Sequence, residues 1–180
     1  MSRAPAPIFW PDAEPEILER DLAAISNFAP GLTYEPPKTD GGQVEHHGRW
    51  IGDLPIWPFD RPEPEGLQNL VPKGVSVVMS YSAAHPVLPP RIVVLDPVPE
   101  LEERTQHRWH VAPGGSLCLL QTEGDWTPET SPVELLFKAA GWRIEYALMK
   151  AGVVDSMTTN GIVSDPARDH LIAEPLPNER

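Results

Sequence analysis

Apolar residues recur at helical spacing near the beginning of the chain. Four of them follow acidic residues suited to a helix start and would share one helix face: Ile17, Leu18, Leu22 and Ile25. The pattern predicts an amphipathic helix over roughly residues 14–28.

After Pro30 the spacing changes, and runs of strand length follow one another between prolines and glycines. A short strand is expected over residues 32–35 and a longer one over residues 43–51. Two further runs, GVSVVMSYS at 74–82 and RIVVL at 91–95, are rich in β-branched residues. Four strands in succession predict an antiparallel meander sheet.

Beyond Pro132 the helical spacing returns and predicts a buried stripe that continues to about residue 150. Its apolar positions are Val133, Leu136, Phe137, Ala140, Ile144, Ala147 and Leu148. The order of helix, strands, irregular segment and helix is typical of an α+β fold. We predict one domain over residues 12–154, with a flexible N-terminus over 1–11 and a C-terminal extension over 155–180; both proline-rich flanks should bury few apolar groups.

Composition excludes several kinds of partner. The 180 residues include 26 Asp and Glu against 14 Lys and Arg, a net charge of −12, whereas nucleic-acid binding depends on cations that neutralise phosphates. No apolar run approaches the roughly 20 residues that span a bilayer, so we expect neither nucleic acid nor a membrane as partner. The N-terminus lacks the apolar run of a secretory signal, and one cysteine suits a reducing compartment, so a cytoplasmic protein is expected.

The irregular segment contains that cysteine, Cys118, within PGGSLCLLQTEGDWTP. Alone, an unpaired cysteine beside leucines is most often a small packing residue. HPVLPP at 85–90 precedes it and WTP follows, and together these motifs resemble those of the ubiquitin-conjugating enzyme (UBC) family. The family carries a proline-rich turn into its fourth strand, a GxxC segment and a WxP motif. Gly115, Ser116, Trp126 and Pro128 fall at the matching positions, where they would support the catalytic loop and groove.

The chain departs from the family pattern at three places. In the proline-rich turn, His85 replaces the usual tyrosine before the first proline. The family's HPN motif is absent, and His110 stands where its asparagine would be, eight residues before the cysteine. An insertion, DPVPELEERTQ at 96–106, separates the fourth strand from this segment, and we interpret its acidic residues Glu100, Glu102 and Glu103 as a solvated face. Such departures are similar to those of divergent prokaryotic relatives found beside ubiquitin-like proteins in antiphage defence operons.

The resemblance implies a UBC fold and thioester chemistry without a cofactor or metal. Cys118 would accept the C-terminus of a ubiquitin-like protein from a separate activating enzyme and pass it to an amine on a target protein. A thiolate suits this task because it attacks well and leaves readily. His110 would stabilise the oxyanion, ionise the thiol, relay a proton or be structural. Asp125 and Glu129 would assist the amine, although their placement beside the cysteine is equally consistent with chance.

Other functions stay open. The same fold would also suit an enzyme that modifies a nucleotidyltransferase of a cyclic-oligonucleotide signalling operon, or a catalytically silent binding module. Zinc at His107, His110 and Cys118 is disfavoured because zinc deaminases carry paired cysteines. A thiol protease built from Cys118, His110 and Asp125 lacks a protease-type cysteine signature. The ending PLPNER has no diglycine, and no nucleotide-binding domain is recognised, so we expect neither the modifier nor its activating enzyme.

Overall fold

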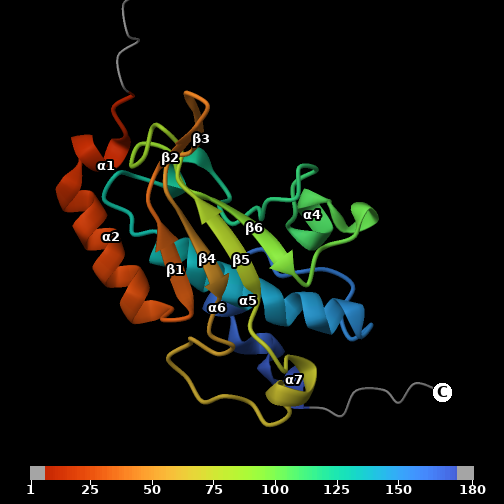
Figure 1. Ribbon diagram of the computed structural model, residues 1–180. Coiled ribbons are helices and arrows are strands. Elements are labelled where there is room, and N and C mark those ends of the chain that lie inside the picture. The colour runs from red at the N-terminus through yellow and green to blue at the C-terminus, as the bar shows by residue number, and fades with distance from the viewer. Residues whose placement is uncertain (1–6, 174–180) are drawn as a thin grey trace, which may run out of the picture.

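A four-stranded antiparallel sheet forms the centre of the computed structural model, which describes residues 7–173 apart from the side chain of Glu123. In the order of the sheet, its strands are β1 (Leu32–Glu35), β4 (Arg49–Asp53), β5 (Ser76–Ser80) and β6 (Arg91–Asp96) (Figure 1). A separate hairpin, β2 (Lys38–Asp40) and β3 (Gln43–His46), lies between β1 and β4 in the chain. The predicted α+β class and antiparallel meander are therefore confirmed.

The single strand predicted over residues 43–51 is wrong. The chain bends between β3 and β4 at Gly48, whose φ of 99° lies in the region that favours glycine. An added Cβ there would also come within 3.0 Å of the Tyr34 hydroxyl. The bend lets β4 join the main sheet while β3 pairs with β2, a strand that the sequence pattern did not predict.

Two long helices confirm the helical predictions, and shorter ones were missed. The helices are α1 (Trp10–Ala13), α2 (Pro15–Phe28), α3 (Leu67–Leu70), α4 (Gln106–Trp109), α5 (Val133–Lys150), α6 (Gly161–Ser164) and α7 (Asp169–Ala173), with 3₁₀ turns η1 (Leu101–Glu103), η2 (Glu123–Asp125) and η3 (Pro166–Arg168). The α2 helix starts at a proline, whose fixed φ suits the first helical turn. Helices of four or five residues are too short to show a period.

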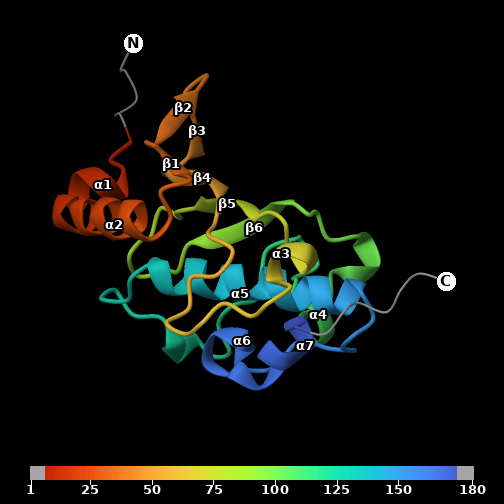
Figure 2. The same ribbon diagram turned by 90° about the horizontal axis from the view of Figure 1, so that it is seen from below.

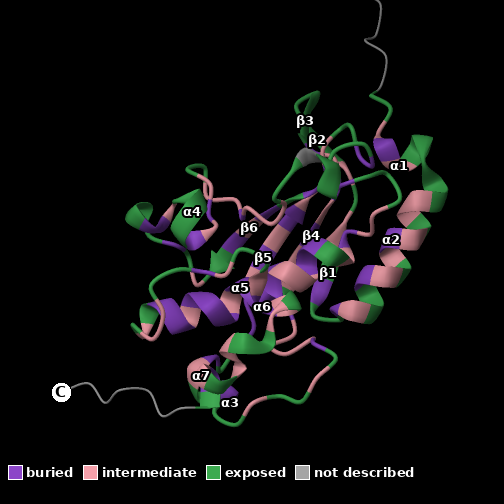
Figure 3. Ribbon diagram, turned by 180° about the vertical axis from the view of Figure 1, so that it is seen from behind, coloured by how far each residue is buried: buried purple, intermediate pink, exposed green. Residues whose placement is uncertain are grey.

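Helix α5 lies between the sheet and the C-terminal helices α6 and α7 (Figure 2). Because it has neighbours on opposite sides, it is buried over much of its surface rather than along one stripe (Figure 3). Gly141 allows the close approach of α6, since a Cβ there would lie 2.8 Å from Val163 Cγ2 and 3.1 Å from Ile162 Cγ2. On the sheet side, Val77 and Met79 of β5 are fully buried.

The flanks bury more apolar surface than expected. Trp10, within the segment predicted to be a flexible N-terminus, is 4% exposed, and its indole N–H donates to the His47 carbonyl at 2.7 Å. In the predicted extension, Ile162 and Ile172 are buried beside α5. The expectation that these flanks bury few apolar groups is therefore wrong at these positions. Residues 1–6 and 174–180, the remainder of that prediction, lie outside the described part of the chain.

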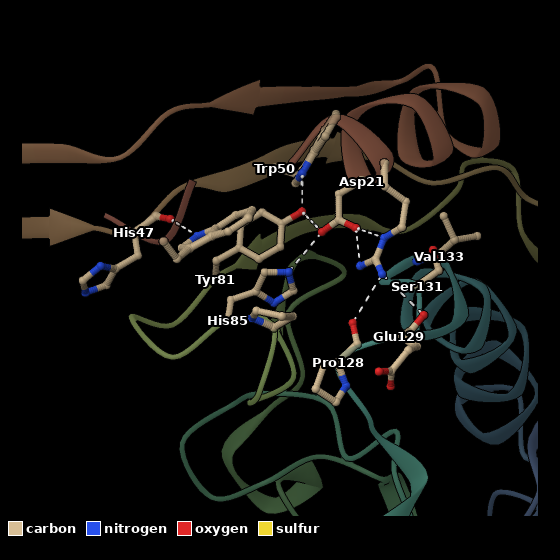
Figure 4. A network of polar contacts seen from close by, with 12 residues as sticks. Asp21, His47, Trp50, Tyr81, His85, Pro128, Glu129, Ser131 and Val133 are labelled. Atoms are coloured by element: carbon tan, nitrogen blue, oxygen red, sulfur yellow. Dashed lines mark hydrogen bonds and ion pairs between the residues drawn. The ribbon is translucent and has the colours of Figure 1, made fainter. Parts of the chain in front are cut away.

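A buried acid joins α2 to the sheet (Figure 4). Asp21 lies on the apolar stripe of α2 and is fully buried. One carboxylate oxygen accepts hydrogen bonds from Tyr81 Oη at 3.2 Å and His85 Nε2 at 3.1 Å, and the other from Arg20 Nε and Nη2 at 3.0 and 2.8 Å. Burial, and then the charge of Asp21, raise the pKa of Tyr81. Through Arg20, which donates to the Pro128 carbonyl at 3.3 Å, the network reaches the loop after the cysteine.

Candidate active site

A short hairpin holds Cys118 opposite His110. Val111 pairs with Leu117, and the Cys118 backbone N–H donates to the His110 carbonyl at 2.8 Å. Gly115 closes the turn with a φ of 87°. The eight-residue spacing noted in the sequence therefore brings the two candidate catalytic residues together.

Both side chains line a cavity of about 710 Å³ between the hairpin and α5. On the helix, Lys138, Trp142 and Glu145 recur every three or four residues and line the same space. The Lys138 ammonium donates to the Leu119 carbonyl at 3.0 Å, beside the cysteine. The cavity is large enough for several amino-acid side chains or for an extended chain terminus.

The Cys118 thiol is half-buried, and burial raises its pKa. The neighbouring Gln106 side chain acts in the opposite direction and lowers the pKa. Because burial dominates, the thiol is mostly protonated at neutral pH. Reaction therefore depends on groups that stabilise the small thiolate fraction.

His110 ends α4 in the left-handed conformation, with φ 52° and ψ 37°. This region is uncommon for a residue with a Cβ, although histidine enters it more often than most. Burial lowers the pKa of His110, while the charge of Glu145 partly opposes that shift. The imidazole is therefore neutral at pH 7 and offers one N–H donor and one acceptor.

The other predicted loop residues have different surroundings. Ser116 lines the cavity, and Gly115 shapes the turn beside it. Trp126 is buried away from the cavity lining, and its indole N–H donates to the Pro86 carbonyl at 2.9 Å. This contact ties the segment after the cysteine to the proline-rich turn. Pro128 contributes its carbonyl to Arg20, also outside the cavity.

Neither predicted acidic helper lines the cavity. Asp125 accepts hydrogen bonds from the backbone N–H groups of Thr122 and Gln121 at 2.8 and 2.9 Å, which lower its pKa. It therefore caps its own loop. Glu129 is exposed and contributes a backbone carbonyl to Arg20 at 3.4 Å.

The carboxylate that does line the cavity belongs to Glu145, which the sequence analysis missed. This side chain is 2% exposed, and Oε1 accepts from Thr158 Oγ1 at 2.8 Å and Arg168 Nη1 at 3.0 Å. The available signal was its position on the predicted apolar stripe, directly after Ile144 and three residues before Leu148. Its partners come from the predicted C-terminal extension, which also contributes Met157 and Asn160 to the cavity wall.

The acidic insertion is only partly a solvated face. Glu100 and Glu102 are exposed, but Glu103 is 4% exposed and accepts from Tyr146 Oη at 2.7 Å and Lys150 Nζ at 2.6 Å. Burial would raise the pKa of Glu103, but hydrogen bonds from Lys150, the Glu100 backbone and Tyr146 bring it below its ordinary value. The insertion is thus anchored on α5.

No three His, Cys, Asp or Glu side chains in the described residues gather closely enough to hold a metal ion. A Cys118–His110–Asp125 protease triad has no support from the geometry, since Asp125 does not line the cavity. Within residues 7–173, no helix has the length and apolar character needed to cross a membrane. Compared with known proteins, the sequence matches no protein-family model and no curated protein.

Proposed function

We propose that this chain is a ubiquitin-conjugating-like enzyme of bacterial antiphage defence. Cys118 carries a ubiquitin-like protein as a thioester, received from a separate activating enzyme, and transfers it to an amine on a target protein. The observation that carries the proposal is the position of this thiol, half-buried at a cavity and directly across a hairpin from His110. The element order supports it, because a helix and a four-stranded meander precede the cysteine loop and a long helix follows.

The charge states of the two residues favour one role for His110 among those considered. A neutral imidazole does not supply the positive charge that would ionise a neighbouring thiol. Its single N–H is available to a negative oxygen instead. We therefore assign His110 to the oxyanion that forms when the amine attacks the thioester.

The test supplies the purified chain with ATP and with the ubiquitin-like protein and activating enzyme encoded beside it. We expect a covalent adduct on non-reducing gels that a thiol reductant removes. A Cys118→Ser variant should form an oxyester that resists the reductant, and Cys118→Ala should form no adduct. An adduct that persists in Cys118→Ala contradicts the assignment of Cys118 as the acyl carrier. If the wild-type chain forms no adduct, the catalytically silent binding module is the better interpretation.

A further inference from the structure

The backbone on both sides of His110 is held by hydrogen bonds from different parts of the fold. The Trp109 carbonyl accepts the indole N–H of Trp142 on α5 at 2.8 Å. The His110 carbonyl accepts the backbone N–H of Cys118, also at 2.8 Å. These two carbonyls belong to the peptide planes that flank the His110 Cα. Because a residue has only two soft backbone dihedrals, holding both planes fixes its conformation.

The conformation held in this way is the left-handed one, with φ 52° and ψ 37°. In the described part of the chain, His110 is the only residue other than glycine with a positive φ. A residue with a Cβ disfavours this conformation by roughly five- to thirtyfold. His110 directly follows α4, and the last carbonyls of a helix have no partner within it. The Trp142 N–H therefore satisfies a carbonyl at the helix end and keeps His110 from continuing the helix.

Trp142 is itself held firmly on α5. It is 3% exposed, and its ring stacks on Tyr146 with the ring centroids 4.7 Å apart. The Tyr146 ring also contacts Trp109 at a centroid distance of 5.5 Å, and its hydroxyl donates to the buried Glu103 at 2.7 Å. The indole is thus a rigid donor whose position is set by the helix, and it lines the same cavity as the imidazole.

We propose that Trp142 is a positioning residue for acyl transfer, which keeps His110 in the left-handed conformation with its imidazole in the cavity beside Cys118. This inference rests on the proposed function, in which the imidazole N–H stabilises the oxyanion. During transfer, the amine nitrogen bonds to the acyl carbon, and the carbon–sulfur bond breaks with its electron pair on Cys118. The proton released by the amine goes to the thiolate. Trp142 takes no part in these steps and acts only through the Trp109 peptide.

The experiment removes the indole N–H from the full chain. Trp142→Phe keeps an aromatic ring without the donor, and replacement of Trp142 by benzothienylalanine keeps the bicyclic ring as well. Trp57→Phe is the matched control, because the Trp57 indole N–H also donates to a backbone carbonyl, that of Arg61 at 2.8 Å, outside the cavity lining. Melting temperatures verify that each variant is folded. If Trp142→Phe melts below the wild type, the benzothienylalanine variant decides the test.

The first measurement is an NMR titration of the His110 ring, which needs no protein partner. The signals of this ring are identified by their absence from His110→Ala. Burial lowers the pKa of His110, and a ring released from its place in the cavity is better hydrated. We therefore expect both Trp142 variants to raise the pKa of His110 toward its ordinary value of 6.5, and the Trp57 control to leave it unchanged.

The substitutions alter none of the other titratable groups that line the cavity, which are Arg91 of β6, His107 of α4, Cys118 of the hairpin, and Lys138 and Glu145 of α5. A change in the titration of His110 thus reports a change in the position of its ring. An unchanged pKa of His110 in both Trp142 variants overturns the inference.

The second measurement compares loading of Cys118 with single-turnover discharge of its adduct to a free amine. We expect both Trp142 variants to slow discharge by roughly five- to thirtyfold, because an unheld His110 leaves the left-handed conformation to that extent, while loading changes little. In a His110→Ala background, the same substitutions should slow discharge no further.

Additive slowing in that background, or equal slowing of loading and discharge, makes the role of Trp142 purely structural and overturns the inference. A wild-type chain that forms no adduct refutes the proposed function alone. The titration, which needs no adduct, then decides whether Trp142 holds His110.

Discussion

Replacing Asp21 by alanine tests what holds α2 to the sheet. The substitution removes a fully buried carboxylate that accepts four hydrogen bonds, two of them from the buried side chains of Tyr81 and His85. The His85 ring then loses its remaining hydrogen bond, because its Nδ1 already has no hydrogen-bond partner within the described residues. Tyr81 keeps only the indole N–H that Trp50 donates to its oxygen at 3.1 Å.

The magnitude follows from the burial of each partner. A buried donor left without an acceptor costs about 1–3 kcal/mol, so the Tyr81 hydroxyl and the His85 ring N–H together predict a loss of about 2–6 kcal/mol in the free energy of unfolding. Arg20 adds little, because its side chain is 34% exposed and water replaces the lost contact. Tyr81→Phe removes the donor to Asp21 and leaves the buried Trp50 indole N–H without its acceptor, so it should cost about 1–3 kcal/mol.

Urea unfolding followed by tryptophan fluorescence measures this free energy, since Trp50 donates to Tyr81 and Trp10 packs on both rings, at centroid distances of 4.7 Å to Tyr81 and 4.5 Å to His85. Glu19→Ala, at an exposed acid of the same helix, is the matched control and should stay within about 0.5 kcal/mol of the wild type. If Asp21→Ala loses less than about 1 kcal/mol, the network does not hold the helix and the reasoning is refuted.

Three further predictions follow from the structure. His110→Ala should slow single-turnover discharge of the Cys118 adduct to a free amine by roughly a hundredfold or more. The loading rate and the pH midpoint for alkylation of Cys118 by iodoacetamide should change little. Equal slowing of loading, discharge and alkylation would contradict the oxyanion role. Gly141→Ala should lower the free energy of unfolding by up to about 2 kcal/mol. Overpacking against Val163 costs about 1–3 kcal/mol, and the higher helix propensity of alanine offsets about 1 kcal/mol of that cost. A variant that is more stable than the wild type in urea would refute this prediction. The pKa of Glu103 is lower in the folded chain than its ordinary 4.5, so its stabilisation is present above that pH and is lost as pH falls through the folded value; urea midpoints of Glu103→Gln should decline less steeply below about pH 4.5 than those of the wild type.

The local pattern determined the long elements. Helix α2 and strand β1 end where apolar spacing and prolines predicted, because an amphipathic period over three or more turns reports directly on which face is buried. The meander followed from four consecutive strand-length runs. The eight-residue spacing between His110 and Cys118 was also visible, and a tight hairpin across a glycine is what turns that spacing into proximity.

Tertiary structure alone decided which polar residues meet. Glu145 and Gln106 are 27 and 12 residues from Cys118, and no local rule joins them to it. Asp125 is close to the cysteine in the chain, yet its carboxylate is directed to its own loop by backbone N–H groups that need an acceptor. Sequence proximity therefore pointed to the wrong acid.

Burial of charged residues likewise depended on long-range packing. The pattern of α2 predicts an apolar face, but whether Asp21 on that face is buried depends on two donors in the segment directly after β5, about sixty residues away. From the sequence, Glu103 is expected to be one of several surface acids. In the fold it is buried because Tyr146 and Lys150 of α5 donate hydrogen bonds to it. A buried charge is stable only when distant partners satisfy it, and those partners are brought together by the fold rather than by the local sequence.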